Sequence, residues 1–347
     1  MALTESPATP HLRRLIAPLR PWLAEPSTEE IAINRPGEAW VRQRGNFTRH
    51  DVALDLQDLQ AIAVLAGALR RQDVGWSNPL LAAELPDGER IQVCLFPVVP
   101  HGRISLTLRK PGAAVVPLAD AGSRYGTAEW NNAKDTRRAR DMDQLLALFA
   151  SGNLIAFLEQ CVHSRLNMLL TGPTGSGKTT LAKSLVAAID PEERLITIED
   201  VLELVITQPN HVRLLFQRDD AADTVIDPEG LLQACLRMRP DRVFLAEIRG
   251  PEAWTYVTGV MPPHPGSIST IHGHSAASAL RRLFALCKSS PAGASLDDRT
   301  LGVLLADTVD VVVPLRENRG AFSIAGVWFI GDALRRGESA VALLQES

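Results

Sequence analysis

The stretch of sequence that decides the fold is MLLTGPTGSGKTT, residues 168–180. Its apolar beginning predicts a buried strand, and residues 172–179 fit the pattern GxxxxGK followed by Ser or Thr, which joins a strand to a helix around a phosphate group. The glycines allow the backbone to turn closely enough for successive amides to face the phosphates, and the N-terminus of the following helix adds a favourable dipole. A glycine-rich turn that matches by chance is the alternative, and the strand before the loop and the helix after it argue against that alternative.

Each part of this motif has an expected contact with a bound nucleotide. Lys178 is expected to reach the β and γ phosphates of ATP and to take part in catalysis, and the hydroxyl of Thr179 is expected to ligate Mg²⁺. The predicted ATP-binding residues at this loop are Gly172, Pro173, Thr174, Gly175, Ser176, Gly177, Lys178, Thr179 and Thr180.

Length and charge limit the class of protein. At 347 residues the chain exceeds what one hydrophobic core usually serves, so two domains are expected. Proteins that neutralise many nucleic-acid phosphates carry runs of Lys and Arg, whereas this chain has a formal net charge of −4 and no long basic run. Direct sequence-specific binding of nucleic acid is therefore not expected.

The sequence also indicates a cellular compartment. The apolar stretch at 61–69 is about half as long as a bilayer-spanning helix, and the N-terminus lacks the pattern of a secretory signal. The cysteines are far apart and form no CxxC pair, so neither a disulfide framework nor a zinc site is predicted. These features favour the reducing cytoplasm.

The pattern of apolar residues divides the chain into two predicted domains. Residues 1–112 are predicted to form a smaller N-terminal α+β domain, and residues 141–347 an ATPase domain with a mostly parallel sheet. Residues 113–140 lack convincing periodicity and are interpreted as the interdomain linker.

The expected elements of the N-terminal domain are a hairpin, a helix and two further strands. The hairpin turns at Pro36-Gly37, because the segments on either side alternate apolar and polar residues. The expected strands are 30–34, 39–42, 90–95 and 104–108, and the expected helix is 59–69.

Beyond residue 141, strands alternate with helices, which is typical of a parallel sheet covered on both faces. Asp227 before Pro228 indicates a helix start, because Asp is a favoured cap and Pro a favoured first residue. The strands are predicted at 167–170, 195–198, 212–216, 242–246, 267–271 and 309–313, and the helices at 179–189, 228–238, 251–261 and 275–286.

Glu247 follows the apolar strand predicted at 242–246. A buried parallel strand delivers its last side chains to the carboxyl edge of the sheet, where the phosphate-binding loop also lies. Glu247 is therefore expected to meet the Mg²⁺ shell, directly or through water, and the water that attacks the nucleotide. The alternative is a surface carboxylate that happens to follow a strand.

Two further strand ends carry polar residues of interest. Glu199 and Asp200 are adjacent, so only one of them is expected to face the nucleotide and orient the hydrolytic water; capping of a helix by Asp200 is the alternative. His272 and His274 follow the strand at 267–271, where an imidazole can sense the γ-phosphate. A structural role for these histidines is equally compatible with the sequence.

These motifs, in this order, resemble the secretion traffic ATPases, and in particular the hexameric ATPase of type IV secretion systems. The resemblance extends over about residues 12–330, so it is much more specific than the phosphate-binding loop alone. It rests on INRPGE (33–38), GERIQ (88–92), residues 104–111, the phosphate-binding loop, ITIEDV (196–201), LRMRP (236–240), EIRG (247–250) and residues 265–272.

The resemblance implies a RecA-like P-loop ATPase domain and functional roles for single residues. Glu199 falls in the acidic box of the family, Glu247 is its second-motif glutamate and His272 lies in its histidine box. Arg109 matches a basic position at the end of an N-terminal-domain strand, so it is implied to contact phosphate from the other domain.

The resemblance also implies a cytoplasmic Mg²⁺-dependent ATPase motor, peripheral to the inner membrane, that energises assembly of a type IV secretion channel or substrate transfer through it. The implied partners are five further copies in a homo-hexamer and the secretion-channel and coupling ATPase proteins. A pilus assembly or retraction motor shares every nucleotide motif. A nucleotide-gated scaffold with little turnover and a DNA-translocating helicase are alternatives from other classes.

Overall fold

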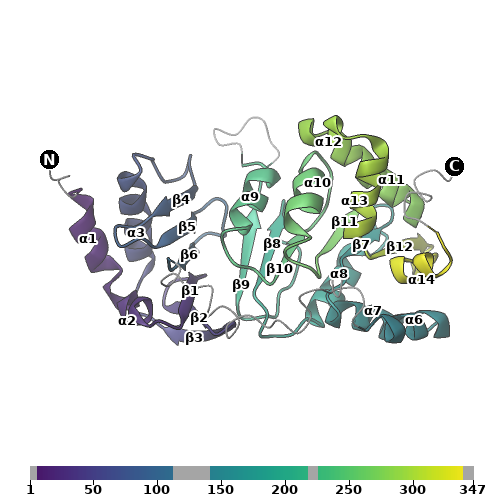
Figure 1. The fold of residues 1–347 in the computed structure, drawn as a ribbon, viewed down its shortest axis with the longest axis horizontal. Helices are drawn as coiled ribbons and strands as arrows, with labels where there is room; N and C mark the ends of the chain where they lie inside the picture. The colour runs from purple at the N-terminus through teal and green to yellow at the C-terminus, as the bar shows by residue number, and fades with distance from the viewer. Residues whose placement is uncertain (1–5, 112–140, 218–225, 339–347) are drawn as a thin grey trace, which may run out of the picture.

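The computed structural model describes residues 6–111, 141–217 and 226–338. Figure 1 shows an elongated molecule, with the N-terminal elements in one half and the elements after residue 141 in the other. Most buried apolar side chains of each half form their own hydrophobic core. The linker predicted at 113–140 lies outside the described residues, so the domain boundaries stay a prediction.

The N-terminal half contains an antiparallel sheet in the order β3-β2-β1-β6-β5-β4. The predicted hairpin is confirmed, because Ile31 pairs with Val41 and Gly37 takes the left-handed conformation, with a φ of 83°, in the turn. The strands are β1 (Thr28–Ile33), β2 (Glu38–Gln43), β3 (Asn46–Asp51), β4 (Leu80–Glu84), β5 (Arg90–Cys94) and β6 (Ser105–Arg109).

Helices cover this sheet and complete its core. The predicted helix at 59–69 begins earlier, because Asp55 and Asp58 form a reciprocal capping box at its N-terminus. The buried side chains of Leu59, Ile62 and Ala63 belong to the same core as the sheet. The helices are α1 (Ala8–Leu15), η1 (Ala17–Leu19), α2 (Arg20–Ala24) and α3 (Leu56–Leu69).

The C-terminal half contains parallel strands in two hydrogen-bonded groups, β10-β8-β9 and β11-β7-β12, with β13 and β14 attached antiparallel to β12. A parallel bridge from Glu247 to Thr270 links the groups. The mixed α/β fold class predicted from the sequence is confirmed. The strands are β7 (Met168–Thr171), β8 (Leu195–Glu199), β9 (His211–Leu215), β10 (Arg242–Leu245), β11 (Ile268–Ile271), β12 (Val311–Asn318), β13 (Ala321–Ile324) and β14 (Trp328–Phe329).

Helices surround these strands, and α9 begins where the sequence indicates. Asp227 accepts a hydrogen bond from the amide of Gly230 at 2.6 Å, which confirms the predicted cap. The helices are α6 (Met142–Ser151), α7 (Leu154–His163), α8 (Lys178–Ala187), α9 (Pro228–Cys235), α10 (Glu252–Thr255), α11 (Ala276–Lys288), α12 (Pro291–Ser295), α13 (Asp298–Thr308) and α14 (Ile330–Arg335).

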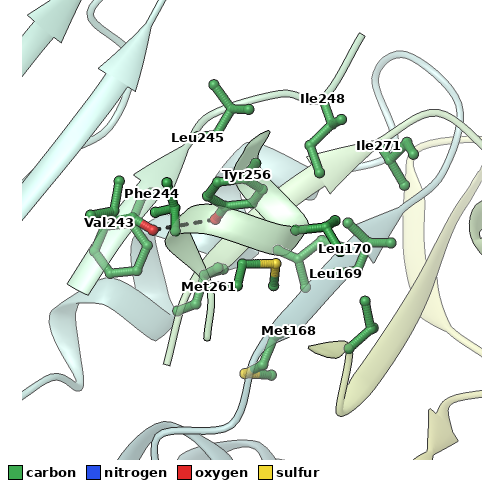
Figure 2. Packing of buried hydrophobic residues seen from close by; sticks show 14 of the residues in the cluster. Met168, Leu169, Leu170, Val243, Phe244, Leu245, Ile248, Tyr256, Met261 and Ile271 are labelled. Carbon is green, nitrogen blue, oxygen red and sulfur yellow. Dashed lines mark hydrogen bonds between the residues drawn. The ribbon is translucent and has the colours of Figure 1, made fainter. Parts of the chain in front are cut away.

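The helix predicted at 251–261 differs from the expectation, because α10 passes into a π turn at η2 (Tyr256–Val260). Figure 2 shows the Tyr256 ring among apolar residues of β7 and β10. Its hydroxyl donates to the carbonyl of Val243 at 3.2 Å and accepts from Ser269 at 2.6 Å. A buried tyrosine hydroxyl needs such partners.

The two halves are joined by a buried polar network around Arg194. Its Nη1 donates to the side-chain oxygens of Asn34 at 2.8 Å and Asn210 at 2.5 Å, and its Nε donates to the carbonyl of Met238 at 3.0 Å. The Asn34 amide also donates to Asn210 at 3.0 Å. Because Asn34 follows β1 and the other residues belong to the C-terminal half, this network fixes one half against the other.

Arg194 remains charged in this setting. Its side chain is fully buried, and burial lowers its pKa to about 10, against the effect of Glu30 and Asp241. A pKa of about 10 leaves the guanidinium protonated at neutral pH, so its hydrogen bonds are charge-assisted.

We expect Arg194→Ala to lower the free energy of unfolding by roughly 2–4 kcal/mol, because the buried amides lose a charged donor and a cavity remains. Urea denaturation followed by circular dichroism measures this loss. Arg335→Ala, which truncates an exposed residue of α14, is the control and should change stability by less than about 0.5 kcal/mol. Equal stability of the two variants would contradict the assignment of this network as an interdomain tie.

Candidate functional site at the phosphate-binding loop

The loop between β7 and α8 curls tightly because of where its glycines lie. A Cβ on Gly172 would lie 2.4 Å from the Ser176 Oγ and 2.6 Å from the Leu315 carbonyl oxygen, so a side chain at this position does not fit. Gly177 has a φ of 87°, which favours glycine, and it places the N-terminus of α8 at the end of the loop. The amides and the helix terminus therefore converge as the sequence predicts.

Lys178, the first residue of α8, folds back over this loop. Its Nζ donates to the carbonyls of Gly172 at 2.7 Å and Pro173 at 2.9 Å. Burial lowers its pKa, the carboxylate of Glu247 opposes this effect and the guanidinium of Arg249 adds to it. The ammonium group thus lies inside the curl of the loop, within electrostatic reach of both residues.

Glu247 lies just beyond β10, and two basic side chains hold its carboxylate. The His272 Nε2 lies 2.7 Å from its Oε1, and Arg249 Nη2 forms a close ion pair with its Oε2. The hydrogen bond to Glu247 is the main reason that the pKa of Arg249 is raised. The Glu247 side chain is 17% exposed, and its Oε1 is buried and accepts no hydrogen bond from the described residues.

One pocket brings most of the predicted site residues together. Glu247 and His272, both predicted from strand ends, line it together with residues 174–180 of the phosphate-binding segment. Its lining residues are Thr174, Gly175, Ser176, Gly177, Lys178, Thr179, Thr180, Glu203, Glu247, Arg249, Thr270, His272 and Phe322.

The pocket has oxygen ligands suited to Mg²⁺. Thr179 and Glu247 line both this pocket and an adjoining cavity, and hydroxyl and carboxylate oxygens are the ligands that Mg²⁺ prefers, usually with several waters. The Ser176 hydroxyl, also in the pocket, is buried without a hydrogen-bond partner. These residues fit a bound phosphate–Mg²⁺ group.

Glu199 lies elsewhere, and the structure does not bring it to this pocket. Its side chain is fully buried and accepts two hydrogen bonds from Arg213, at 3.0 and 2.9 Å. It also accepts from the hydroxyl of Thr197 and from the amides of Glu203 and Leu204. With its lone pairs used in this way, Glu199 is placed to hold the chain after β8 rather than to orient a water.

Asp200, the neighbour of Glu199, faces the other way, as the alternation along a strand requires. It lines the cavity next to the pocket and pairs with Arg249 at 3.2 Å. The alternative in which Asp200 caps a helix is wrong, because the residues that follow it are not helical. Arg249 therefore bridges two strand ends, Asp200 after β8 and Glu247 after β10.

Arg109 ends β6 in the N-terminal half and lies in a different groove. Its Nε is 3.7 Å from the buried carboxylate of Glu30, which Arg239 approaches from a second side at 3.5 Å. Arg90 also lines this groove. Figure 1 places β6 and α8 in different halves of the molecule, so one subunit does not bring Arg109 to the phosphate-binding loop.

Four residues that line the pocket, Glu203, Arg249, Thr270 and Phe322, were not among the predicted site residues. Arg249 stands two positions after Glu247, within the segment EIRG (247–250), which was quoted for the family resemblance and not for the charge of its arginine. Phe322 lies on β13, beyond the last predicted strand, where Arg319-Gly320 was the available signal for a hairpin turn.

Comparison with known proteins gives consistent similarities. A family model described as "Type II/IV secretion system protein" matches residues 132–318. "Protein VirB11" of Rhizobium radiobacter is 52% identical over 339 residues, which is 97% of this chain and 99% of that protein. "Type IV secretion system protein PtlH" of Bordetella pertussis is 37% identical over 317 residues, covering 90% of this chain and 93% of that protein.

A solved structure is also similar over almost its full length. The crystal structure of the VirB11 ATPase from the Brucella suis type IV secretion system, in complex with sulphate, aligns with a TM-score of 0.88 and 33% sequence identity. The alignment covers 98% of both chains. In the described residues of the present structure, no helix is long and apolar enough to cross a membrane.

The position of Glu199 generates a prediction about stability. We expect Glu199→Gln to lower the free energy of unfolding by roughly 1–3 kcal/mol, because the buried amide lacks the charge and the second acceptor oxygen that hold the partly exposed Arg213 and the Glu203 and Leu204 amides. Chemical denaturation of the purified variant tests this. Glu192→Gln, which makes the same change at an exposed position, is the matched control and should unfold nearly as the wild type does. A Glu199 variant of wild-type stability would reopen a role for this residue at the nucleotide.

Proposed function

Because the chain belongs to the type II/IV secretion system protein family, and within it to the VirB11 ATPases of type IV secretion systems, we propose that it hydrolyses ATP in a Mg²⁺-dependent reaction to drive secretion. The observation that carries the proposal is the Glu247 carboxylate, paired with His272 and Arg249 in the pocket that the phosphate-binding loop also lines. The sulphate reported for the Brucella relative is an anion that resembles a phosphate group.

The pocket residues divide the reaction between binding and proton transfer. The loop amides and Lys178 hold the β and γ phosphates, and their positive charge stabilises the negative charge that builds up during transfer. Glu247 accepts a proton from a water molecule while the oxygen of that water forms a bond to the γ-phosphorus. The bond from that phosphorus to the bridging oxygen breaks, and ADP leaves with the electron pair.

The neighbours of Glu247 determine how well it performs this step. Arg249 donates a hydrogen bond to Oε2 and the His272 Nε2 lies 2.7 Å from Oε1, so the two side chains flank the carboxylate in the pocket. Mg²⁺, held by Thr179 and by Glu247 through water, would neutralise phosphate charge when bound. His272, half exposed at the pocket edge, is placed to respond to loss of the γ-phosphate.

We further propose that the protein works as a ring of six subunits on the cytoplasmic face of the inner membrane, with secretion-channel and coupling ATPase proteins as partners. Arg109 supports this proposal. Because Arg109 and the loop lie in different halves of one subunit, a contact between Arg109 and phosphate requires the N-terminal half of a neighbouring subunit. Phosphate release, together with particle mass with and without ATP, tests the activity and the ring.

The alternatives are less well supported. A pilus motor shares the nucleotide motifs, but the Bordetella pertussis relative and the Brucella suis structure carry type IV secretion names. A scaffold with little turnover has no need for a paired carboxylate in the pocket of the loop, and both Lys178 and Glu247 line the pocket.

We expect Glu247→Gln to bind ATP and to hydrolyse it roughly 10²- to 10⁴-fold more slowly, because the amide keeps the shape of the side chain and cannot accept the proton. Single-turnover hydrolysis measures the chemical step directly. Lys178→Ala is the comparison, because it should weaken nucleotide binding as well as turnover. A normal single-turnover rate in Glu247→Gln would remove this residue as the base.

The position of Arg109 generates a separate prediction about the assembled ring. We expect Arg109→Ala to weaken ATP more than ADP, by about 1–3 kcal/mol, because the lost contact is a charge-assisted hydrogen bond to the γ-phosphate. Nucleotide titration of the assembled protein measures both affinities. Arg49→Ala, on exposed β3, is the control. Equal losses for ATP and ADP would move the contact away from the γ-phosphate, and no loss would exclude Arg109 from the site.

A further inference from the structure

An exposed aromatic ring lies directly beside the phosphate-binding loop. Phe322 is 65% exposed, although burial of a phenylalanine side chain contributes about 1.5–3 kcal/mol. A Cβ on Gly177 would lie 3.3 Å from the Cδ1 of this ring, so the ring is seated against the loop itself. Phe322 lines the same pocket as Lys178 and Glu247.

The hairpin that carries Phe322 is firmly placed. β12 pairs in parallel with β7, the strand that leads into the loop, and then continues beyond the sheet. β13 returns antiparallel along this extension, with Phe322 opposite Glu317. The backbone pairing thus fixes the Cα of Phe322 relative to the loop.

The strand order gives the pocket two distinct ends. β7 lies between β11 and β12. Glu247 and His272, which face the γ-phosphate under the proposed function, follow β10 and β11 and therefore lie on the β11 side. Phe322 lies on the β12 side. A nucleotide with its phosphate chain in the loop and its γ-phosphate toward Glu247 extends its other end, the sugar and base, toward Phe322.

We propose that the Phe322 ring stacks on the base of the bound nucleotide. This inference rests on the proposed function and deepens it, because it assigns the base-binding side of the same pocket. A phenyl ring carries no hydrogen-bonding group, so it binds the face of any purine and does not distinguish adenine from guanine. It distinguishes a nucleotide from a bare polyphosphate.

Isothermal titration with ATP, GTP and inorganic tripolyphosphate tests this assignment. Phe322→Ala should weaken ATP and GTP each by roughly ten-fold, the range for loss of one base–aromatic stack, and should leave tripolyphosphate binding unchanged. Phe322→Trp should restore ATP affinity, and its indole fluorescence should change when ATP binds and not when tripolyphosphate binds. Ile155→Ala, an exposed apolar residue on α7, is the control for loss of surface apolar area.

Several outcomes would overturn the assignment. Equal weakening of ATP and tripolyphosphate would mean that Phe322 only shapes the loop. If Phe322→Ala leaves the ATP affinity unchanged and lowers the particle mass, the Phe322 side chain is a contact between subunits. If the wild-type protein binds neither ATP nor tripolyphosphate, the proposed function itself fails, and that result is separate from any effect of Phe322.

Discussion

A parallel sheet gathers the carboxyl ends of its strands at one edge, and the whole candidate site depends on this constraint. The phosphate-binding loop follows β7, Glu247 follows β10 and His272 follows β11. In the part of the chain that the structure describes, a short backbone bridge from Glu247 to Thr270 joins the two hydrogen-bonded groups of strands. The proposed base thus stands at the junction of the two groups, where its position depends on both.

Local signals predicted the part of the site that is built locally. The loop and its two flanking elements form one continuous segment, so residues 172–180 were predictable from spacing alone. Glu247 and His272 were predictable as strand ends, because the sheet edge is shared. The structural role of Glu199 was not predictable, because the direction in which a carboxylate points depends on the residue that pairs with it. That partner, Arg213, stands on another strand, and no pattern in the sequence linked the two.

Distant packing explains the other differences. Hydrophobic periodicity does not separate an α turn from a π turn, because the two differ by one residue. The π turn at Tyr256 accompanies tertiary hydrogen bonds of its hydroxyl with Val243 and Ser269, which no local pattern predicts. Helices α6 and α7 were missed because they precede the first strand of the expected alternation. Arg109 was correctly placed at a strand end, but which groove it enters depends on how the two halves pack, and sequence spacing holds no information on that.

The polar network around Arg194 has a mechanical consequence. Separating the two halves of a subunit would expose the buried guanidinium of Arg194 and the buried amides of Asn34 and Asn210 at the same time. Such a contact resists gradual sliding, since its hydrogen bonds require fixed geometry. A subunit built in this way transmits force as one stiff body. In the proposed ring of such bodies, the compliance would lie at the contacts between neighbouring subunits.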